Sequence, residues 1–358
     1  MSFAAPNQAA PVADATSRGT RETSVLLEVR DLSVEFATSS GALHAVRKVS
    51  FDVHRGETLA IVGESGCGKS TCVQALTGLI ATPPGRISGS AKLSGHELIG
   101  LTEHELNAIR GARVGMIFQD PMSSLNPTMP VGKQIAEALR AHRRISRTAA
   151  QERAVQLLGR MRITDPAARA QQYPFELSGG MAQRVMIALS VVCEPELLIA
   201  DEPTTALDVT IQEQVLELLE ELQRGTGMAI VLITHDLGVV ARIADRVAVM
   251  YAGEIVEVGS VEEIFYRSAH PYTAALKAAL PRADQPRRAR LRAIEGAPPG
   301  LLQTLKGCSF LERCPHAMEL CSIRAPDPQA VAPAHTARCW LHHPRAPRTA
   351  DIHQPLSA

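Results

Sequence analysis

The chain has 358 residues, of which 45% are hydrophobic and 21% are charged, and this length is enough for about two domains with sizeable cores. It carries 37 Lys and Arg residues against 37 Asp and Glu residues, so its formal net charge is zero. That balance argues against a protein whose main task is to neutralise nucleic-acid phosphates. No stretch approaches the ~20 apolar residues needed to cross a bilayer, so we do not expect the chain to span a membrane by itself.

Residues 1–24 are rich in Ala, Pro and Thr, and they have neither the basic segment nor the apolar core of a secretory signal. We therefore predict a disordered tail over residues 1–24 and a cytosolic location. The chain has seven cysteines, an odd number, and a protein without a secretory signal rarely forms disulfides.

Short apolar runs punctuate the chain between residues 25 and 265. Residues 26–36 alternate apolar and polar side chains, as a half-buried strand does. Residues 59–62, 197–200 and 229–233 are instead continuous apolar runs, which are typical of parallel strands covered by helices on both faces. The pattern predicts an α/β fold with its functional site at the carboxyl ends of these strands.

Helical patterns fill the intervals between these runs. The clearest cover residues 151–161 and 211–225, the second closing on a glycine, and a largely helical insertion lies between residues 121 and 177. Residues 281–306 then bear prolines and arginines, which predict a linker before a small terminal domain. We interpret the arginines as a solvated linker face rather than a membrane-surface patch. They are Arg287, Arg288, Arg290 and Arg292.

The residues that follow the run at 59–62 fit the pattern G-x-x-x-x-G-K-S/T of a phosphate-binding loop. Glycines allow a tight turn that points several N–H groups at one phosphate, and the helix N-terminus adds its dipole. Lys69 would supply a charge for the β- and γ-phosphates, and the Ser70 hydroxyl would ligate Mg²⁺. The strand context disfavours the alternative, a glycine-rich turn with an incidental lysine. The predicted nucleotide-binding residues are Gly63, Glu64, Ser65, Gly66, Cys67, Gly68, Lys69, Ser70 and Thr71.

Asp201 and Glu202 stand at the end of the second continuous apolar run. Beside a bound Mg-nucleotide, the first carboxylate can hold the metal and the second can orient or deprotonate an attacking water. Such a pair is a weak signal by itself, because many strands end in an acid that only caps the next helix. Three further features agree with it in order and spacing: Gln119 after an apolar segment, residues 177–181 before a helix, and His235 after the third run.

With these motifs in this order, the sequence resembles the ATP-binding subunits of ABC transporters over roughly residues 26–265. The resemblance implies an ABC-type P-loop NTPase domain over residues 25–267, with a helical subdomain at about residues 121–185. The matches are residues 63–71 with Walker A, Gln119 with the Q-loop, residues 177–181 with the signature, residues 197–202 with Walker B, Ala206 to Asp208 with the D-loop, and His235 with the switch histidine.

The resemblance also implies how the motifs act. Two such domains would pair head to tail around two ATP molecules, so that the signature of each serves the partner's nucleotide. Glu202 would activate the hydrolytic water, His235 would contact the γ-phosphate, and Gln119 would sense the nucleotide. Mg²⁺ would be held by Ser70, Gln119 and Asp201.

Phe36 lies where the family stacks an aromatic ring on adenine, and the alternative is a core position at the end of a strand. The signature departs from the family pattern in its last residue, which is methionine where glutamine is usual. Methionine keeps the volume but lacks the amide, so any hydrogen bond from that side chain is lost. The signature residues are Leu177, Ser178, Gly179, Gly180 and Met181.

Residues 270–273 and 295–315 resemble the C-terminal extension of one branch, the ATPases of dipeptide and oligopeptide importers, and we place this extension at residues 268–358. The resemblance implies a peripheral ATPase at the cytoplasmic face of the cell's inner membrane. Its partners would be two membrane-spanning permease subunits, a second ATPase that the family suggests is a distinct paralogue, and indirectly an extracytoplasmic binding protein. The solute stays open among dipeptides, longer peptides, glutathione and nickel.

Two other classes of function fit the sequence less well. A soluble ABC ATPase of translation or DNA repair usually has tandem nucleotide domains or a long coiled-coil insertion, and this chain has one Walker A and a short insertion. A redox-sensing binding module would not need both Glu202 and His235.

Four cysteines near the C-terminus have the spacing C-x5-C-x6-C-x17-C. Four thiolates in about thirty residues suit a tetrahedral metal or a 4Fe–4S cluster, and spacing alone does not separate the two. His316 and His335 keep a zinc site open, and free thiols packed as small hydrophobes are a third reading. The family resemblance implies a 4Fe–4S cluster with a structural role, and we expect nucleotide binding at Lys69 not to depend on it. The cysteines are Cys308, Cys314, Cys321 and Cys339.

Overall fold

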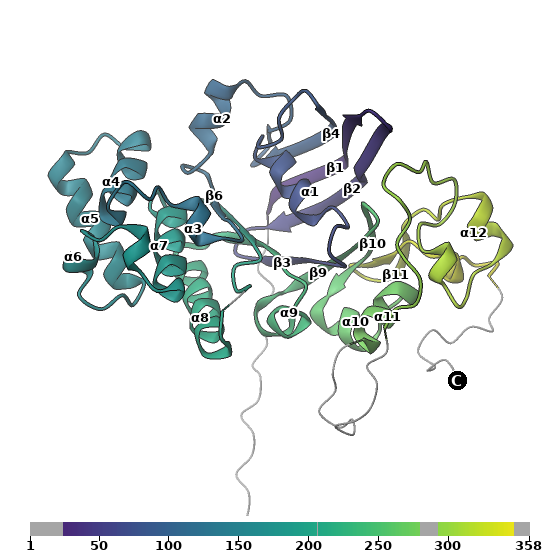
Figure 1. Ribbon diagram of the computed structural model, residues 1–358. Helices are drawn as coiled ribbons and strands as arrows, with labels where there is room; N and C mark the ends of the chain where they lie inside the picture. Colours follow the sequence, from purple (N-terminus) through teal and green to yellow (C-terminus); the bar gives the residue numbers. More distant parts are fainter. Residues whose placement is uncertain (1–23, 206, 280–292, 347–358) are drawn as a thin grey trace, which may run out of the picture.

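The computed structural model describes residues 24–205, 207–279 and 293–346. The predicted tail up to residue 23, the arginine run and Ala206 lie outside the described residues. The described part has two sheets at its centre, a helical region at one side and the C-terminal extension at the opposite side (Figure 1). Within it, no helix is both long and apolar enough to cross a membrane.

The smaller sheet is antiparallel, with the strand order β2-β1-β4-β5. The predicted strand at residues 26–36 is confirmed as part of β1, whose buried side chains include Leu27, Val29, Leu32 and Val34. Their two-residue spacing breaks once, at a bulge beside Asp31, which has a φ of 49°. The bulge returns the later residues to the core face. The strands are β1 (Val25–Thr38), β2 (Gly41–His54), β4 (Gly85–Leu93) and β5 (His96–Glu97).

The larger sheet has the order β11-β12-β10-β9-β3-β8-β7-β6, and its strands from β9 to β6 are parallel. The three continuous apolar runs are confirmed as β3, β7 and β8, in which every residue is buried. Because these strands are parallel neighbours, their carboxyl ends lie along one edge. The strands are β3 (Thr58–Val62), β6 (Val114–Ile117), β7 (Leu197–Asp201), β8 (Ala229–Ile233), β9 (Arg246–Tyr251), β10 (Glu254–Ser260), β11 (Gln329–Ala332) and β12 (His335–Ala337).

Helices cover both faces of the larger sheet, and alternate side chains of its strands belong to different cores. Leu59 and Ile61 of β3 pack with α1 (Lys69–Leu76) and the smaller sheet, whereas Ala60 and Val62 pack with α9 (Leu237–Ile243). The helix predicted at residues 211–225 is α8 (Val209–Thr226). It is closed by Gly227 and not by Gly225: Gly227 has a left-handed φ of 71°, a C-terminal conformation that glycine adopts without strain.

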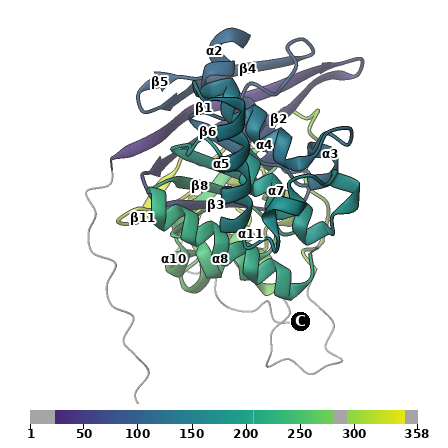
Figure 2. The same cartoon turned by 90° about the vertical axis from the view of Figure 1, so that its left-hand side faces the viewer.

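The predicted helical insertion is confirmed: residues 121–191 contain helices and no strand (Figure 2). Ile135, Leu158 and Met186 are fully buried and join these helices to the face of the large sheet that α8 covers. The helices are α3 (Pro121–Ser124), α4 (Val131–His142), α5 (Arg147–Arg160), α6 (Pro166–Arg169) and α7 (Gly179–Val191), and α2 (Glu103–Ile109) lies before them in the chain.

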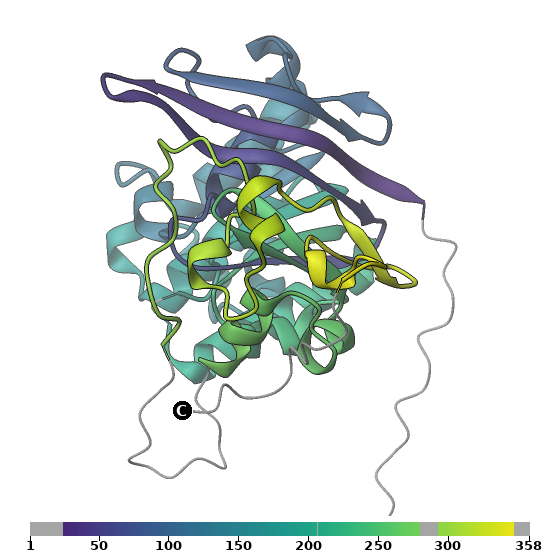
Figure 3. The same cartoon turned by 90° about the vertical axis from the view of Figure 1, so that its right-hand side faces the viewer.

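The C-terminal extension continues the larger sheet, because β12 pairs with β10 (Figure 3). Glu257 of β10 is fully buried and accepts hydrogen bonds from His335 Nε2 (2.8 Å) and from the backbone N–H groups of Ala269 (2.6 Å) and His270 (2.9 Å). These bonds tie both ends of the extension to one strand of the nucleotide domain. α10 (Val261–Tyr266) precedes the extension, whose helices are α11 (Pro271–Ala278) and α12 (Glu319–Ile323).

Candidate functional site

The predicted phosphate-binding loop joins the end of β3 to the start of α1. Gly63 and Gly68 have φ values of 157° and 104°, and a Cβ at either position would collide with a neighbouring carbonyl oxygen. Glycine is therefore required at both ends of the turn. Lys69 is buried and donates from Nζ to the carbonyl oxygens of Gly63 (2.9 Å) and Glu64 (3.0 Å). The ammonium is thus fixed inside the loop.

Two of the three predicted magnesium ligands meet at the carboxyl edge of the sheet. Ser70 Oγ, in the first turn of α1, donates to Asp201 Oδ1 at the end of β7 (3.0 Å). Burial raises the pKa of Asp201, and the Ser70 hydrogen bond only partly opposes that rise. A divalent cation beside the pair would favour the carboxylate, and hydroxyl and carboxylate oxygens are ligands that Mg²⁺ prefers. The third predicted ligand, Gln119, donates to Glu202 (2.9 Å).

Glu202 is the centre of a hydrogen-bonded cluster. Its φ of 49° is unusual for a residue with a side chain, and such strain is often stored at functional sites. The carboxylate accepts from Gln119 Nε2 and Thr205 Oγ1 (2.9 Å each), and His235 Nδ1 lies 3.1 Å away. Burial alone would raise the pKa of Glu202, but the hydrogen bonds from His235 and Thr205 outweigh it and lower the pKa. The carboxylate is therefore ionised at neutral pH.

Thr205 was missed by the sequence analysis. A short turn follows β7, in which the Thr205 N–H donates to the Glu202 carbonyl oxygen (3.2 Å). That turn brings the hydroxyl back to the carboxylate three positions earlier. The usable signal was a hydroxyl residue soon after an acid at the end of a strand.

The signature and the D-loop line a separate open hollow of about 500 Å³. Ser178 caps α7 by accepting from the Met181 N–H (3.4 Å), and Asp208 caps α8 by accepting from the Ile211 N–H (3.0 Å). The lining includes no residue of the phosphate-binding loop at 63–71, so the hollow and the loop are separate features of the chain. The lining residues are Arg162, Ile163, Thr164, Ser178, Gly179, Gly180, Met181, Arg184, Leu207, Asp208 and Ile211.

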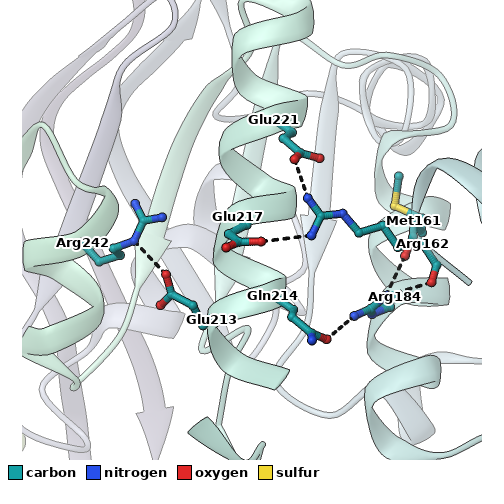
Figure 4. Close-up of polar contacts among 8 residues, drawn as sticks. All are labelled: Met161, Arg162, Arg184, Glu213, Gln214, Glu217, Glu221 and Arg242. Carbon is teal, nitrogen blue, oxygen red and sulfur yellow. Dashed lines mark hydrogen bonds and ion pairs between the residues drawn. The ribbon is translucent and has the colours of Figure 1, made fainter. Parts of the chain in front are cut away.

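Arginines anchor the signature helix α7 to α8 (Figure 4). Arg184 of α7 donates to the carbonyl oxygen of Arg162 (3.1 Å) and to Gln214 of α8 (2.6 Å). Arg162 in turn forms ion pairs with Glu217 and Glu221 of α8. The position of the signature is thereby tied to the helix that begins at the D-loop.

Phe36 lies near the end of β1, opposite Leu43 of β2 and Gly85 of β4. Its ring is partly buried against the core beneath the smaller sheet. The position leaves part of the ring exposed, which is compatible with both readings made from the sequence.

The four C-terminal cysteines line one small cavity, together with His316. His335 does not line it and is bonded to Glu257. Burial raises the pKa of Cys308 and of Cys339 to about 12, so an electropositive centre would be needed to hold them as thiolates. Within the described residues, no group of three or more His, Cys, Asp or Glu side chains is arranged to hold a metal ion.

Two residues of the extension reach the phosphate-binding loop, and the sequence analysis missed both. Arg313 forms an ion pair with the Glu64 carboxylate, and Tyr272 Oη accepts from the Glu64 N–H (3.0 Å). Arg313 and Glu64 are 249 positions apart, and no local pattern in the sequence marks such a contact.

Comparison with known proteins identifies both parts of the chain. The family described as ABC transporter matches residues 46–205, and the family described as Oligopeptide/dipeptide transporter, C-terminal region, matches residues 256–321. The Dipeptide transport ATP-binding protein DppD of Bacillus subtilis is 49% identical over 322 residues, which cover 90% of this chain and 96% of that protein. The Oligopeptide transport ATP-binding protein OppD of Salmonella typhimurium is 50% identical over 329 residues, which cover 92% and 97%.

Solved structures agree on the fold. The dimeric ATP-binding cassette MJ0796 in a post-hydrolysis state, bound to ADP and Pi, has a TM-score of 0.60 and 26% identity. The match covers 66% of this chain and 99% of that one. The predicted α/β ABC-type fold is therefore confirmed.

Proposed function

This chain belongs to the ATP-binding proteins of the dipeptide and oligopeptide ABC transporters, and we propose that its Glu202 activates the water that hydrolyses ATP. The chain is the ATPase subunit of a di- or oligopeptide importer. The observation that carries the proposal is the convergence of Gln119, Thr205 and His235 on one ionised carboxylate. An ionised carboxylate can take a proton from water, and three polar neighbours fix its orientation.

The chemistry is divided among the ends of four parallel strands, β3, β6, β7 and β8, with Gln119 following β6. After β3, the loop N–H groups and Lys69 would bind the phosphates, with Phe36 stacking on adenine. At the end of β7, Asp201 would hold Mg²⁺ together with Ser70 of α1, and the ion would neutralise charge that develops on the phosphate oxygens. After β8, His235 orients Glu202 and would contact the γ-phosphate. Gln119 would sense the nucleotide through its bond to the same carboxylate and join the magnesium shell.

The test is turnover and nucleotide affinity in the assembled transporter. Glu202→Gln should lower turnover by about 10²-fold or more and keep ATP binding, because it removes the base and preserves the shape. Lys69→Ala should instead weaken nucleotide binding, since it removes a contact already made in the ground state. Wild-type turnover in the Glu202→Gln complex would overturn the assignment.

We propose further that two nucleotide domains pair head to tail. The separation of the signature hollow from the loop at 63–71 supports this, because one chain then holds half of each composite site. Ser178 and Gly180 would face the partner's nucleotide. The isolated subunit should hydrolyse ATP poorly, and the second ATPase in the assembly is proposed to be a distinct paralogue.

Exposed apolar side chains support a docking surface for the two permease subunits. Phe118 and Met122 flank Gln119, while Tyr173 and Phe175 precede the signature and stack with ring centroids 5.6 Å apart. Large apolar side chains gathered on a surface commonly mark interfaces. We propose that the membrane subunits dock here, which places the ATPase at the cytoplasmic face of the inner membrane. The extracytoplasmic binding protein would act through these subunits.

We propose that Cys308, Cys314, Cys321 and Cys339 hold a 4Fe–4S cluster in the extension at residues 268–358. Their shared cavity supports this. A cluster offers one iron to each thiolate, so its ligands need not converge on one point. Ligation would supply much of the folding free energy of a segment with little apolar core.

Metal and sulfide analysis of anaerobically purified protein tests the cluster. We expect a brown protein with about four iron and four sulfide per chain, bleached by replacing any one of the four cysteines with serine. One zinc without sulfide would favour the zinc site instead, and no bound metal would leave four ordinary thiols.

A further inference from the structure

The extension is in direct contact with the phosphate-binding loop through Arg313. This residue ends the short 3₁₀ helix Leu311–Arg313, and its side chain is only 4% exposed. Its two terminal nitrogens donate to the two oxygens of the Glu64 carboxylate, at 2.9 Å and 3.0 Å. Such a bidentate arrangement fixes direction as well as distance, because the planar guanidinium matches the carboxylate.

The remaining donors of Arg313 hold it in place from two other segments. It donates to the carbonyl oxygens of Ile294 (3.1 Å) and Glu295 (3.0 Å) and to Tyr251 Oη (3.2 Å) at the end of β9. Its guanidinium therefore has little freedom to follow a carboxylate that moves. The contact positions Glu64 rather than merely neutralising it.

A second residue of the extension holds the backbone of Glu64. Tyr272 of α11 is fully buried, its ring packs against Tyr251 and Phe310, and its Oη accepts from the Glu64 N–H (3.0 Å). The Glu64 carbonyl oxygen accepts from Lys69 Nζ. Every polar group of Glu64 is thus engaged, two of them by the extension and one by the lysine of the phosphate site.

We propose that Arg313 is a positioning residue for the phosphate-binding loop, so that the C-terminal extension sets the nucleotide affinity of the ATPase. The proposal rests on the nucleotide site described above. The same 3₁₀ helix is followed directly by Cys314, which lines the cysteine cavity. The conformation of the cysteine site therefore affects Glu64 through Arg313, which directly precedes Cys314. The proposed coupling differs from the expectation, made from the sequence, that nucleotide binding at Lys69 does not depend on the cluster.

The experiment is a MgATP titration of the purified full-length chain, with KM and kcat of the assembled transporter as a second readout. Arg313→Gln should weaken MgATP binding about tenfold, because a misplaced loop loses ground-state contacts. KM should rise while kcat changes little. Arg313→Lys should restore part of the loss, because it returns the charge but not the bidentate geometry.

Two further variants separate positioning from folding. Glu64→Gln breaks the same pair without touching the extension, and the double variant with Arg313→Gln should be no weaker than the worse single variant. Arg324→Gln is the matched control, since it removes an exposed arginine of the same region that pairs with Asp327, and its MgATP affinity should equal that of wild type.

The outcomes are distinct. Wild-type affinity in both Arg313→Gln and Glu64→Gln would overturn the inference while leaving the proposed ATPase function intact. A wild-type chain that binds no MgATP would overturn the nucleotide site itself. If Arg313→Gln does not fold, the Glu64→Gln affinity decides alone.

Discussion

The nucleotide site and the C-terminal extension are held together by different kinds of contact. In the nucleotide site, Asp201 ends a parallel strand and Lys69 and His235 follow two others, and neighbouring parallel strands bring their ends together. In the extension, Arg313 and Tyr272 reach Glu64 from loops and short helices that no periodic rule aligns. The nucleotide site can therefore be predicted from the order of the motifs, whereas the contact made by the extension depends on how separate segments pack.

The largest effect on turnover is expected at the signature, which the motif order predicts to face the nucleotide of a partner domain. Ser178→Arg puts a bulky cation at the exposed start of α7, beside the hollow of about 500 Å³. Turnover of the assembled transporter should fall about 100-fold or more, because the partner's nucleotide could not seat against the signature. MgATP affinity of the isolated chain should not change, since this surface is not part of its own phosphate-binding loop. Unchanged turnover in the complex would contradict the head-to-tail arrangement.

A smaller effect is expected from the residue of the nucleotide site that the sequence analysis missed. Thr205→Val removes the hydroxyl bonded to Glu202 and nearly keeps the volume, so turnover should fall about tenfold through loss of one hydrogen bond to a charged group. MgATP affinity, measured by titration, serves as the control and should stay at the wild-type value. An unchanged kcat would show that Gln119 and His235 orient the carboxylate without help.

These cases show what could be read from the sequence and what could not. The three buried strands, the helical insertion and the loop at residues 63–71 follow from periodicity and from a motif in its strand context, so all were predictable. The glycine that closes α8 lies two residues later than predicted, because two glycines stand close together and only the backbone shows that Gly227 is left-handed. The pair formed by Arg313 and Glu64 could not be predicted from the sequence, because a buried ion pair depends on tertiary packing and follows no regular spacing along the chain.

A cysteine variant in two backgrounds tests whether the extension acts on the nucleotide site through Arg313. Cys339→Ser should loosen the extension and weaken MgATP binding about fivefold, a coupling of the size that physically connected sites show. In the Arg313→Gln background, the same substitution should have no further effect on MgATP affinity, because the connection is already broken. Thr336→Ser on β12 is the control, because it makes a small change at a half-buried position close to Cys339 in the chain. Equal losses in both backgrounds would mean that the cysteines act on the nucleotide by another route.

The smallest effect is expected at the surface contacts that join the signature helix to α8 (Figure 4). Arg162 is 42% exposed, and exposed ion pairs are weak and screened by salt, so Arg162→Gln should lower turnover of the complex only about twofold at low ionic strength. The difference in turnover between Arg162→Gln and wild type should shrink as salt is raised, because the wild-type protein then loses the same attraction.

Arg242→Gln is the matched control. Arg242 is also exposed and pairs with Glu213 and Glu220 of α8, but it joins that helix to α9 and not to the signature region. A salt-dependent loss in Arg162→Gln that is absent from Arg242→Gln would tie the effect to the position of the signature. Identical behaviour of the two variants would show that α8 needs surface charge in general, and that Arg184, through its bonds to main chain and to Gln214, positions the signature alone.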